Sequence, residues 1–290
     1  MNTLRILCFG DNHGDQNSLQ QVVSETEGEK FDYIIHVGDI TNACEEGLEA
    51  GADQLQQLKP LFAELSKRGE LVYVWGNRDF EICTKGVGTR IDRFSDFPFD
   101  EGTHIPRTGT IDIAGQQFTQ DPDAVDSETI LVTHYYHPEL LDHFEGRAYF
   151  SGHVHTGRRK GNVLNTGFLY RGGEHGATPL QGGYFIVELG SDRMDVSFHS
   201  LGGLEEGSCP DHLARGFQYT PRNWQSNCTF CYEEAPFYTE ILESTQLALE
   251  RTEREVTQTN LYETAIDLYQ HTGVPDDFES TLSSYAEDFL

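Results

Sequence analysis

Basic residues are scarce in this sequence, and lysine is the scarcest of them. The 290 residues include 20 Lys and Arg, of which five are Lys, against 48 Asp and Glu, so the formal net charge is −28. The sequence therefore offers no obvious basic face for tight binding to nucleic acid. Repulsion among so many carboxylates is screened at high salt, so the composition favours a cytoplasmic protein of a salt-loving organism; the alternative is an ordinary acidic protein.

Long apolar runs are also missing, and cysteines are few. No apolar stretch reaches the about 18–20 residues that a membrane span requires, so we expect no membrane partner. A strand-like run begins at Leu4, and we expect no signal peptide. Six cysteines in a chain of this length do not indicate a disulfide framework. Cys8, Cys44 and Cys83 stand alone, and we expect them to be reduced thiols.

The first 80 residues alternate between strand and helix patterns. Apolar runs end at a glycine after each predicted strand, and leucines at helical spacing mark residues 52–68. This alternation predicts a parallel sheet with right-handed crossovers. The predicted strands are residues 4–9, 33–37 and 71–75, and the predicted helices are residues 17–24 and 52–68.

The middle of the chain is richer in strands. Residues 110–113 and 116–118 flank Ala114-Gly115, which is a hairpin signal. We expect the fold class to be α/β (α+β), a β-sandwich of two mixed sheets flanked by helices. The remaining predicted strands are residues 129–133 and 148–151, followed by 162–165, 183–189 and 194–200, which look like consecutive antiparallel strands.

The composition changes after about residue 200. Residues 202–208 are rich in Gly, Glu and Ser, which is typical of a linker. We therefore predict a first domain at residues 1–201, a linker at 202–208, a Cys/His segment at 209–236 and a helical tail at 237–290. The tail has an amphipathic pattern, which favours packing against the first domain; homodimerisation or docking of a partner is the alternative.

Polar side chains follow five of the predicted strands at the point where each strand ends. The carboxyl ends of parallel strands line one crevice, so we expect these side chains to meet there. A mixed set of carboxylates and imidazoles suits a pair of divalent ions, with Mn, Fe or Zn favoured over Ca or Mg. The candidate ligands are Asp11, His13, Asp39, Asn77, His134, His153 and His155.

One of these positions has a local alternative. His137 lies three residues beyond His134, in the sequence His134-Tyr135-Tyr136-His137, and could be the ligand in its place. The position of His134 directly after a predicted strand favours His134.

The ordered motifs Gly-Asp-x-His-Gly, Gly-Asp, Gly-Asn-x-Asp, a lone His after a strand and Gly-His-x-His resemble the calcineurin-like metallophosphoesterase superfamily over residues 4–200. The resemblance implies a helix-flanked β-sandwich that hydrolyses phosphate monoesters or diesters with a metal-bound hydroxide. The candidate catalytic residues are Asn77, Arg78 and His134. Residue by residue, the resemblance places Asp11, His13, Asp39 and His155 around one metal, and Asp39, Asn77, His134 and His153 around the other.

The sequence departs from the superfamily pattern at Arg78, where many members have a histidine that donates a proton to the leaving group. Arginine stays protonated and cannot take this role. It can bind phosphate oxygens through two parallel hydrogen bonds. We therefore expect weak action on poor leaving groups and a shift toward diesters or activated esters.

A second metal site is predicted in the Cys/His segment. Two pairs with x2 spacing are typical of structural zinc sites, in which each pair forms a tight turn around the ion. The expected result is a small zinc-ribbon-like extension, and the alternative is a set of buried thiols. Together with the acidic composition, this segment resembles a haloarchaeal type of the superfamily. The candidate zinc ligands are Cys209, His212, Cys228 and Cys231.

Three functions remain open from the sequence. The first is a two-metal phosphoesterase acting on a phosphate-ester substrate. The second is a catalytically weak binding or adaptor module on the same fold, and the third is a nucleotide or nucleic-acid phosphodiesterase. The complete set of expected ligands favours an enzyme, and the acidic composition offers nucleic acid no electrostatic footprint.

Overall fold

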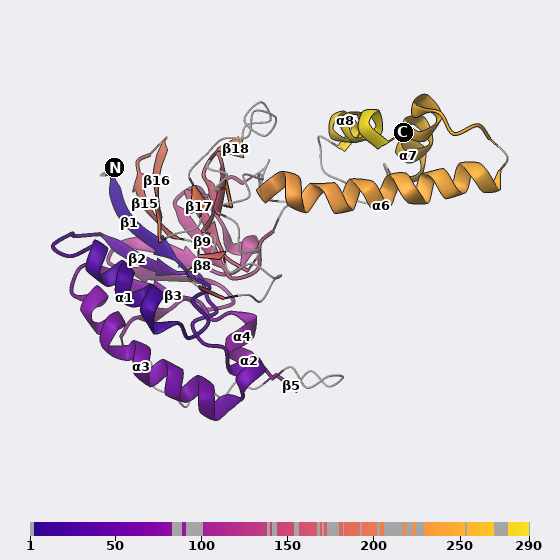
Figure 1. The fold of residues 1–290 in the computed structure, drawn as a ribbon. Coiled ribbons are helices and arrows are strands. Elements are labelled where there is room, and N and C mark those ends of the chain that lie inside the picture. The colour runs from indigo at the N-terminus through magenta and orange to yellow at the C-terminus, as the bar shows by residue number, and fades with distance from the viewer. Residues whose placement is uncertain are drawn as a thin grey trace. The chain divides into compact units, whose positions relative to one another are not determined.

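The computed structural model describes residues 3–82, 89–90, 101–137, 140, 144–153, 157–166, 169, 171–172, 180–181, 183–191, 193–201, 204–205, 217–218, 222–223, 229–252, 254–269 and 278–289. The chain divides into two compact units, Met1–Ser226 and Asn227–Leu290. Both are visible in Figure 1. None of the described helices combines the length and the apolar character needed to cross a membrane.

The first sheet of the N-terminal unit is built around the three strands predicted from the start of the chain. β1, β2 and β3 run parallel, and β6 continues the parallel series beside β3. β15 pairs antiparallel with β1 on its other side, and β16 pairs antiparallel with β15. The strand order is β16 (Met194–Ser200), β15 (Gly183–Leu189), β1 (Leu4–Phe9), β2 (Tyr33–His36), β3 (Glu70–Tyr73) and β6 (Thr103–His104).

The second sheet is also mixed. β8, β9, β10 and β12 are parallel neighbours, whereas β7, β11 and β18 pair antiparallel at the two sides. The order is β18 (Phe217–Gln218), β11 (Gly157–Lys160), β12 (Val163–Thr166), β10 (Ala148–Ser151), β9 (Thr129–Thr133), β8 (Gln116–Thr119) and β7 (Thr110–Ile113). The expected sandwich of two mixed sheets is confirmed.

The predicted pairing of residues 162–165 was wrong. That segment forms β12, which runs parallel to β10 in the second sheet. The strands predicted after it, β15 and β16, form an antiparallel pair in the first sheet. Strand patterns report which residues are extended, but which sheet a strand joins depends on contacts between distant segments.

Alternating side chains in the first sheet pack in two directions. Leu7 and Phe9 of β1 face a core that includes residues of the flanking helices, whereas Ile6 and Cys8 face the core between the two sheets. A strand buried on both faces reads as a continuous apolar run, which explains the sequence of residues 4–9.

Two helices cover the outer face of the first sheet (Figure 1). α1 (Gln16–Glu25) is capped by Asp15, whose side chain accepts a hydrogen bond from the backbone N–H of Asn17. α3 (Leu48–Ser66) contains Pro60 within its length. The short helices are α2 (Ala43–Glu46), α4 (Asn77–Phe80) and the 3₁₀ turn η2 (Pro122–Ala124), and the two-residue strands are β4 (Glu81–Ile82), β5 (Thr89–Arg90), β13 (Arg171–Gly172), β14 (Leu180–Gln181), β17 (Leu204–Glu205) and β19 (Arg222–Asn223).

The C-terminal unit has its own small core. α6 (Thr229–Arg251), α7 (Gln258–Tyr269) and α8 (Phe278–Phe289) contribute Tyr238, Leu242, Ala265, Phe278 and Leu282, among others, to a shared buried cluster. The helical part begins at Thr229 and not at the predicted residue 237, because α6 continues through the end of the predicted Cys/His segment.

The described cysteines of the N-terminal unit are in different states. Cys8 is a free and fully buried thiol, whereas Cys44 in α2 is disulfide-bonded. The expectation of a reduced thiol was therefore wrong for Cys44. Disulfide pairing depends on proximity in the fold, which the spacing of cysteines in the sequence does not report.

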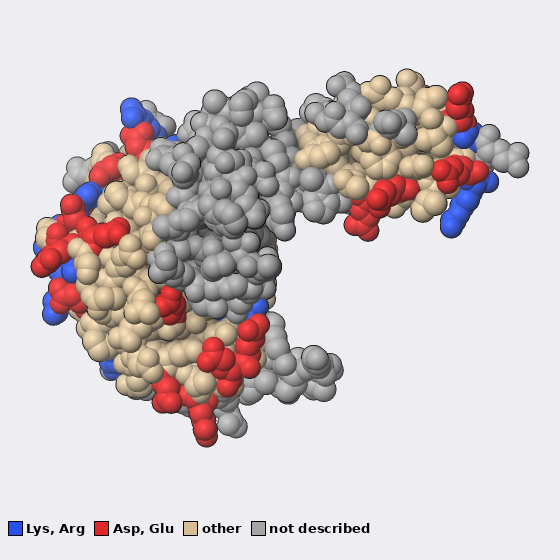
Figure 2. All heavy atoms as spheres, viewed as in Figure 1, with Lys and Arg blue, Asp and Glu red and all other residues tan. Residues whose placement is uncertain are grey.

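The visible surface carries the acidic character that the composition predicts. In Figure 2, Asp and Glu are spread over the described parts of both units, and Lys and Arg are fewer. Several of the basic residues are committed to ion pairs, such as Arg5 with Glu29 and Glu188.

Candidate metal centre

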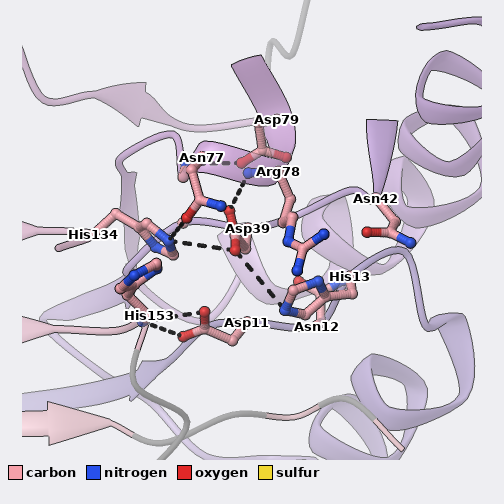
Figure 3. A network of polar contacts seen from close by, with 12 residues as sticks. Asp11, Asn12, His13, Asp39, Asn42, Asn77, Arg78, Asp79, His134 and His153 are labelled. Carbon is pink, nitrogen blue, oxygen red and sulfur yellow. Dashed lines mark hydrogen bonds and ion pairs between the residues drawn. The ribbon is translucent and has the colours of Figure 1, made fainter. Parts of the chain in front are cut away.

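Polar side chains gather where strands of both sheets end. Asp11 and His13 follow β1, Asp39 follows β2, and Asn77 opens α4 after β3. His134 follows β9 and His153 follows β10, in the second sheet. Because β1, β2 and β3 are parallel, and β9 and β10 are parallel, the loops at their carboxyl ends converge on one place, as Figure 3 shows.

Asp11, Asp39 and His134 form the centre of this group. Each offers a ligand atom, these atoms lie within 4.8 Å of one another, and all three residues are buried. Nε2 of His134 lies 3.3 Å from Oδ2 of Asp39. Two carboxylates removed from water at one place are unfavourable unless positive charge compensates them. The arrangement therefore suits a cation.

The ring of His134 is oriented by the backbone. Its Nδ1 lies 3.0 Å from the carbonyl oxygen of Val37, which can only accept, so Nδ1 carries a proton and donates it. This leaves Nε2 facing Asp39 and, at 2.8 Å, Oδ1 of Asn77. A carbonyl that fixes the tautomer in this way is typical of metal-binding histidines.

The negative charge around His134 favours a positive charge at its Nε2. Burial alone would lower the pKa of this imidazole, but the carboxylates of Asp39 and Asp11 outweigh burial and raise the pKa to about 9. A proton on Nε2 then lies between this nitrogen and Oδ1 of Asn77. Imidazole nitrogen, carboxylate oxygen and amide oxygen also form a donor set that fits a divalent ion, which could take the place of that proton.

Two further histidines lie beside the centre. Nε2 of His13 is 3.8 Å from Oδ2 of Asp39, and its side chain is almost fully buried. The backbone N–H of His153 donates to both carboxylate oxygens of Asp11, at 3.2 and 3.1 Å, and its ring centre is 5.1 Å from that of His134. The structure thus brings six of the seven predicted ligands together, and the seventh, His155, lies outside the described residues.

Several of these residues have a left-handed backbone. Asp11, His13, Asp39 and His153 have φ of 51°, 46°, 52° and 70°. Among the described non-glycine residues, only Ala114, in the turn between β7 and β8, shares this conformation. Such strain persists where the surrounding structure enforces it, and it concentrates at functional sites.

Glycines make the close approach of the loops possible. A Cβ on Gly76 would lie 2.0 Å from Oδ1 of Asp39, and one on Gly152 would lie 2.5 Å from Oδ2 of Asp11. Gly38 has φ of 102°, and a Cβ there would lie 2.8 Å from Nδ1 of His134. These glycines are therefore required by the positions of the candidate ligands beside them.

Asp79 links two loops: the loop that contains Asp39 and the loop that contains Asn77. Its buried carboxylate accepts hydrogen bonds from the backbone of Ile40, Thr41 and Gly76, at 3.2, 2.8 and 2.9 Å, and from the hydroxyl of Thr41. Burial, and then the charge of Asp39, raise the pKa of Asp79 to about 7. The Gly-Asn-x-Asp motif contains this residue, but its three backbone partners are visible only in the structure.

A second support lies behind the first loop: His36, whose place inside the second predicted strand indicates a core or supporting role, but whose hydrogen-bond partners the sequence does not reveal. Nδ1 of His36 accepts from the backbone N–H of Gly38 at 3.1 Å, so its Nε2 donates to Oδ1 of Asn12 at 2.8 Å. The amide of Asn12 in turn donates to the carbonyl of Ile40. Burial lowers the pKa of His36 to about 3, which keeps this ring neutral.

Arg78 touches the centre through its backbone. Its N–H donates to Oδ1 of Asp39 at 2.8 Å, which orients that carboxylate. Its guanidinium forms an ion pair with Glu45 of α2. The predicted phosphate-binding residue therefore has a protein partner, which the sequence did not reveal.

His137 does not join the cluster. Its backbone N–H donates to the hydroxyl of Tyr149 at 3.1 Å, and its ring lies 6.5 Å from that of Tyr149. The structure thus places His134, and not His137, beside Asp39.

The predicted zinc ligands of the Cys/His segment are not placed. Cys209, His212 and Cys228 lie outside the described residues. Cys231 falls in the first turns of α6, and its side chain also lies outside the described part. Zinc binding by this segment stays a prediction.

The fold and the cluster define a class of protein: an α/β sandwich with a candidate metal centre at the strand ends. The sequence matches the calcineurin-like phosphoesterase family over residues 4–157, more than half of the chain, and the chain belongs to that family. No curated protein matches the chain.

Three of the solved structures that match part of the chain are as follows. A predicted phosphoesterase from Streptococcus pneumoniae is 18% identical, covers 69% of this chain and 91% of its own, and has a TM-score of 0.36. An archaeal phosphodiesterase is 15% identical, with coverages of 68% and 100% and a TM-score of 0.40. The E. coli phosphoesterase Yfce is 15% identical, with coverages of 69% and 100% and a TM-score of 0.33.

Proposed function

We propose that this protein hydrolyses phosphate esters with two divalent cations, of which Mn, Fe and Zn suit the donor set best. The observation that carries the proposal is the buried group of Asp11, Asp39 and His134 at the strand ends of a calcineurin-like phosphoesterase fold. Asp39 suits a bridging role, because its Oδ2 faces His134 at 3.3 Å and His13 at 3.8 Å.

The residues divide into two sets around Asp39. Two bound cations would neutralise the phosphoryl oxygens and lower the pKa of a water molecule. In this proposal the first set is Asp11, His13, Asp39 and, from the family pattern, His155. The second set is Asp39, Asn77, His134 and His153.

Backbone groups of the protein would keep these ligands oriented before a cation binds. The backbone of Arg78 orients the carboxylate of Asp39, and the carbonyl of Val37 keeps Nε2 of His134 turned inward. Fixed donors of this kind lower the reorganisation needed during the reaction.

Arg78 sets the expected substrate range. Its guanidinium stays protonated, so it can bind phosphoryl oxygens but cannot protonate a leaving group. We therefore propose diesters and esters with good leaving groups as the preferred substrates.

The test is hydrolysis of bis-p-nitrophenyl phosphate and p-nitrophenyl phosphate in molar KCl with Mn²⁺. We expect the parent protein to be active and Asp39→Asn to lose nearly all activity, because a neutral amide is a poor bridge between two cations. Asp53→Asn, the same change at an exposed position of α3, is the control and should stay active.

A folded, Mn-loaded parent that cleaves neither ester would contradict the proposal for these substrates and would favour the binding-module alternative. An Asp39→Asn protein as active as the control would exclude the bridging role of Asp39.

A further inference from the structure

The ion pair between Glu45 and Arg78 joins two short helices at the edge of the candidate centre. Glu45 lies in α2 and Arg78 in α4, and these helices pack beside each other. The side chain of Arg78 is 18% exposed and that of Glu45 is 44% exposed, so the pair faces solvent mainly through its carboxylate.

Glu45 is held by the residue that precedes α2. Nδ2 of Asn42 lies 3.5 Å from Oε2 of Glu45 and 3.1 Å from Oε1 of Glu46. The backbone N–H of Asn42 donates to the side chain of Gln54 at 2.8 Å, and Asn42 is buried. Glu45 therefore extends from a helix whose start is anchored through Asn42.

Arg78 connects this pair to the ligands. Its backbone N–H lies 2.8 Å from Oδ1 of Asp39, and Figure 3 shows its side chain extending among the residues of the centre, on the side where His13 lies. A phosphoryl group held at the centre would meet a guanidinium whose charge is already balanced by a carboxylate.

We propose that Glu45 is a specificity-determining residue that acts through Arg78 and disfavours dianionic phosphate monoesters relative to monoanionic diesters. A dianion gains more than a monoanion from an unpaired guanidinium, and it suffers more from a nearby carboxylate. Pairing with Glu45 weakens the attraction of Arg78 for the second negative charge, and the carboxylate of Glu45 also repels that charge. The inference rests on the proposed phosphoesterase function and concerns the same site.

The experiment compares Glu45→Gln with Glu46→Gln. Both remove one negative charge from α2, but Glu46 bonds to Asn42 and Gln54 and serves as the matched control. Two quantities are measured on Mn-loaded protein in molar KCl at pH 8: the dissociation constant of inorganic phosphate, and kcat/KM for the monoester and the diester.

In Glu45→Gln we expect phosphate to bind about two- to fivefold more tightly, a size typical of a partly exposed ion pair. The monoester-to-diester ratio of kcat/KM should rise by a similar factor, mainly through KM. Glu46→Gln should change neither quantity. In an Arg78→Ala background, the additional change Glu45→Gln should have no effect, because the residue through which it acts is gone.

An unchanged phosphate affinity and ratio in Glu45→Gln would overturn the inference. So would an equal change in Glu46→Gln, which would show a general charge effect, or an effect that persists without Arg78. If the parent cleaves neither ester, the proposed function fails, and the phosphate dissociation constants still decide the role of Glu45.

Discussion

Gly76→Ala is the sharpest test of how closely the ligand loops are packed. The new Cβ would lie 2.0 Å from Oδ1, 2.4 Å from the backbone nitrogen and 2.7 Å from Cγ of Asp39. Asp39 must move by about 1 Å to bring the shortest contact to the 3.0 Å that real Cβ atoms respect. The backbone at Gly76 is not left-handed, so the effect of the change is steric.

A shift of this size exceeds what a metal site tolerates, because ligand distances vary by only about 0.2 Å. We expect the affinity for Mn²⁺ to fall by at least the roughly 10–100-fold seen when ligand orientation is lost. Overpacking should also lower the free energy of unfolding of the metal-free protein by about 1–3 kcal/mol.

The assay is calorimetric titration of Mn²⁺ into metal-free protein, together with urea unfolding and hydrolysis of bis-p-nitrophenyl phosphate. Gly190→Ala is the control, because its backbone is also not left-handed and its new Cβ would meet only the carbonyl of Arg193 at 3.4 Å. A Gly76→Ala protein with the Mn²⁺ affinity and activity of the control would refute the claim that Asp39 is placed by this contact.

Two further predictions concern titration and support of the loops. The pKa of His134 is raised to about 9 in the metal-free protein, so a proton must leave Nε2 before a cation binds there. The apparent Mn²⁺ affinity should therefore rise roughly tenfold per pH unit up to about pH 9. The same pKa shift stabilises the metal-free fold, fully below about pH 6.5, the ordinary pKa, and this contribution is lost as the pH rises through 9. An Mn²⁺ affinity that stays flat from pH 6.5 to 8.5 would contradict the competition between a proton and the cation at Nε2. Asp79→Ala leaves buried N–H groups of Ile40, Thr41 and Gly76 without their acceptor, and urea unfolding should show a loss of about 2–4 kcal/mol. A loss below about 0.5 kcal/mol would show that water replaces the carboxylate.

The sequence was most informative where a pattern is local. Apolar runs marked β1, β9, β15 and β16 at the residues where the structure has them, because burial on one or both faces selects such runs. The polar residues after the strands could be grouped because parallel strands present their carboxyl ends together.

Individual side-chain pairings between distant segments were not predicted. Nothing near Glu45 in the sequence indicates its pairing with Arg78, which arises from the packing of α2 on α4. The hydrogen bond between His36 and Asn12 similarly joins the ends of two different strands. Cys44 appeared isolated for the same reason.

The boundary after the first domain was also difficult to place. The Gly-rich stretch at 202–208 suggested a boundary after residue 201, whereas the first compact unit extends along the sequence to Ser226. Strands β17, β18 and β19 lie in this interval within the first unit, and two-residue strands leave almost no periodic signal in a sequence.

The position of β1 between β15 and β2 affects when the candidate centre can form as the chain is synthesised. β1 carries Asp11 at its end, and it is flanked by β2 on one side and by β15 on the other. The described ligands up to His153 all emerge from the ribosome before β15, Gly183–Leu189. The growing chain therefore contains these ligands before β1 has both of its neighbours, and long-range pairing of this kind is slow. Assembly of the candidate centre in its final geometry is thus tied to completion of the first sheet, and not to synthesis of its side chains.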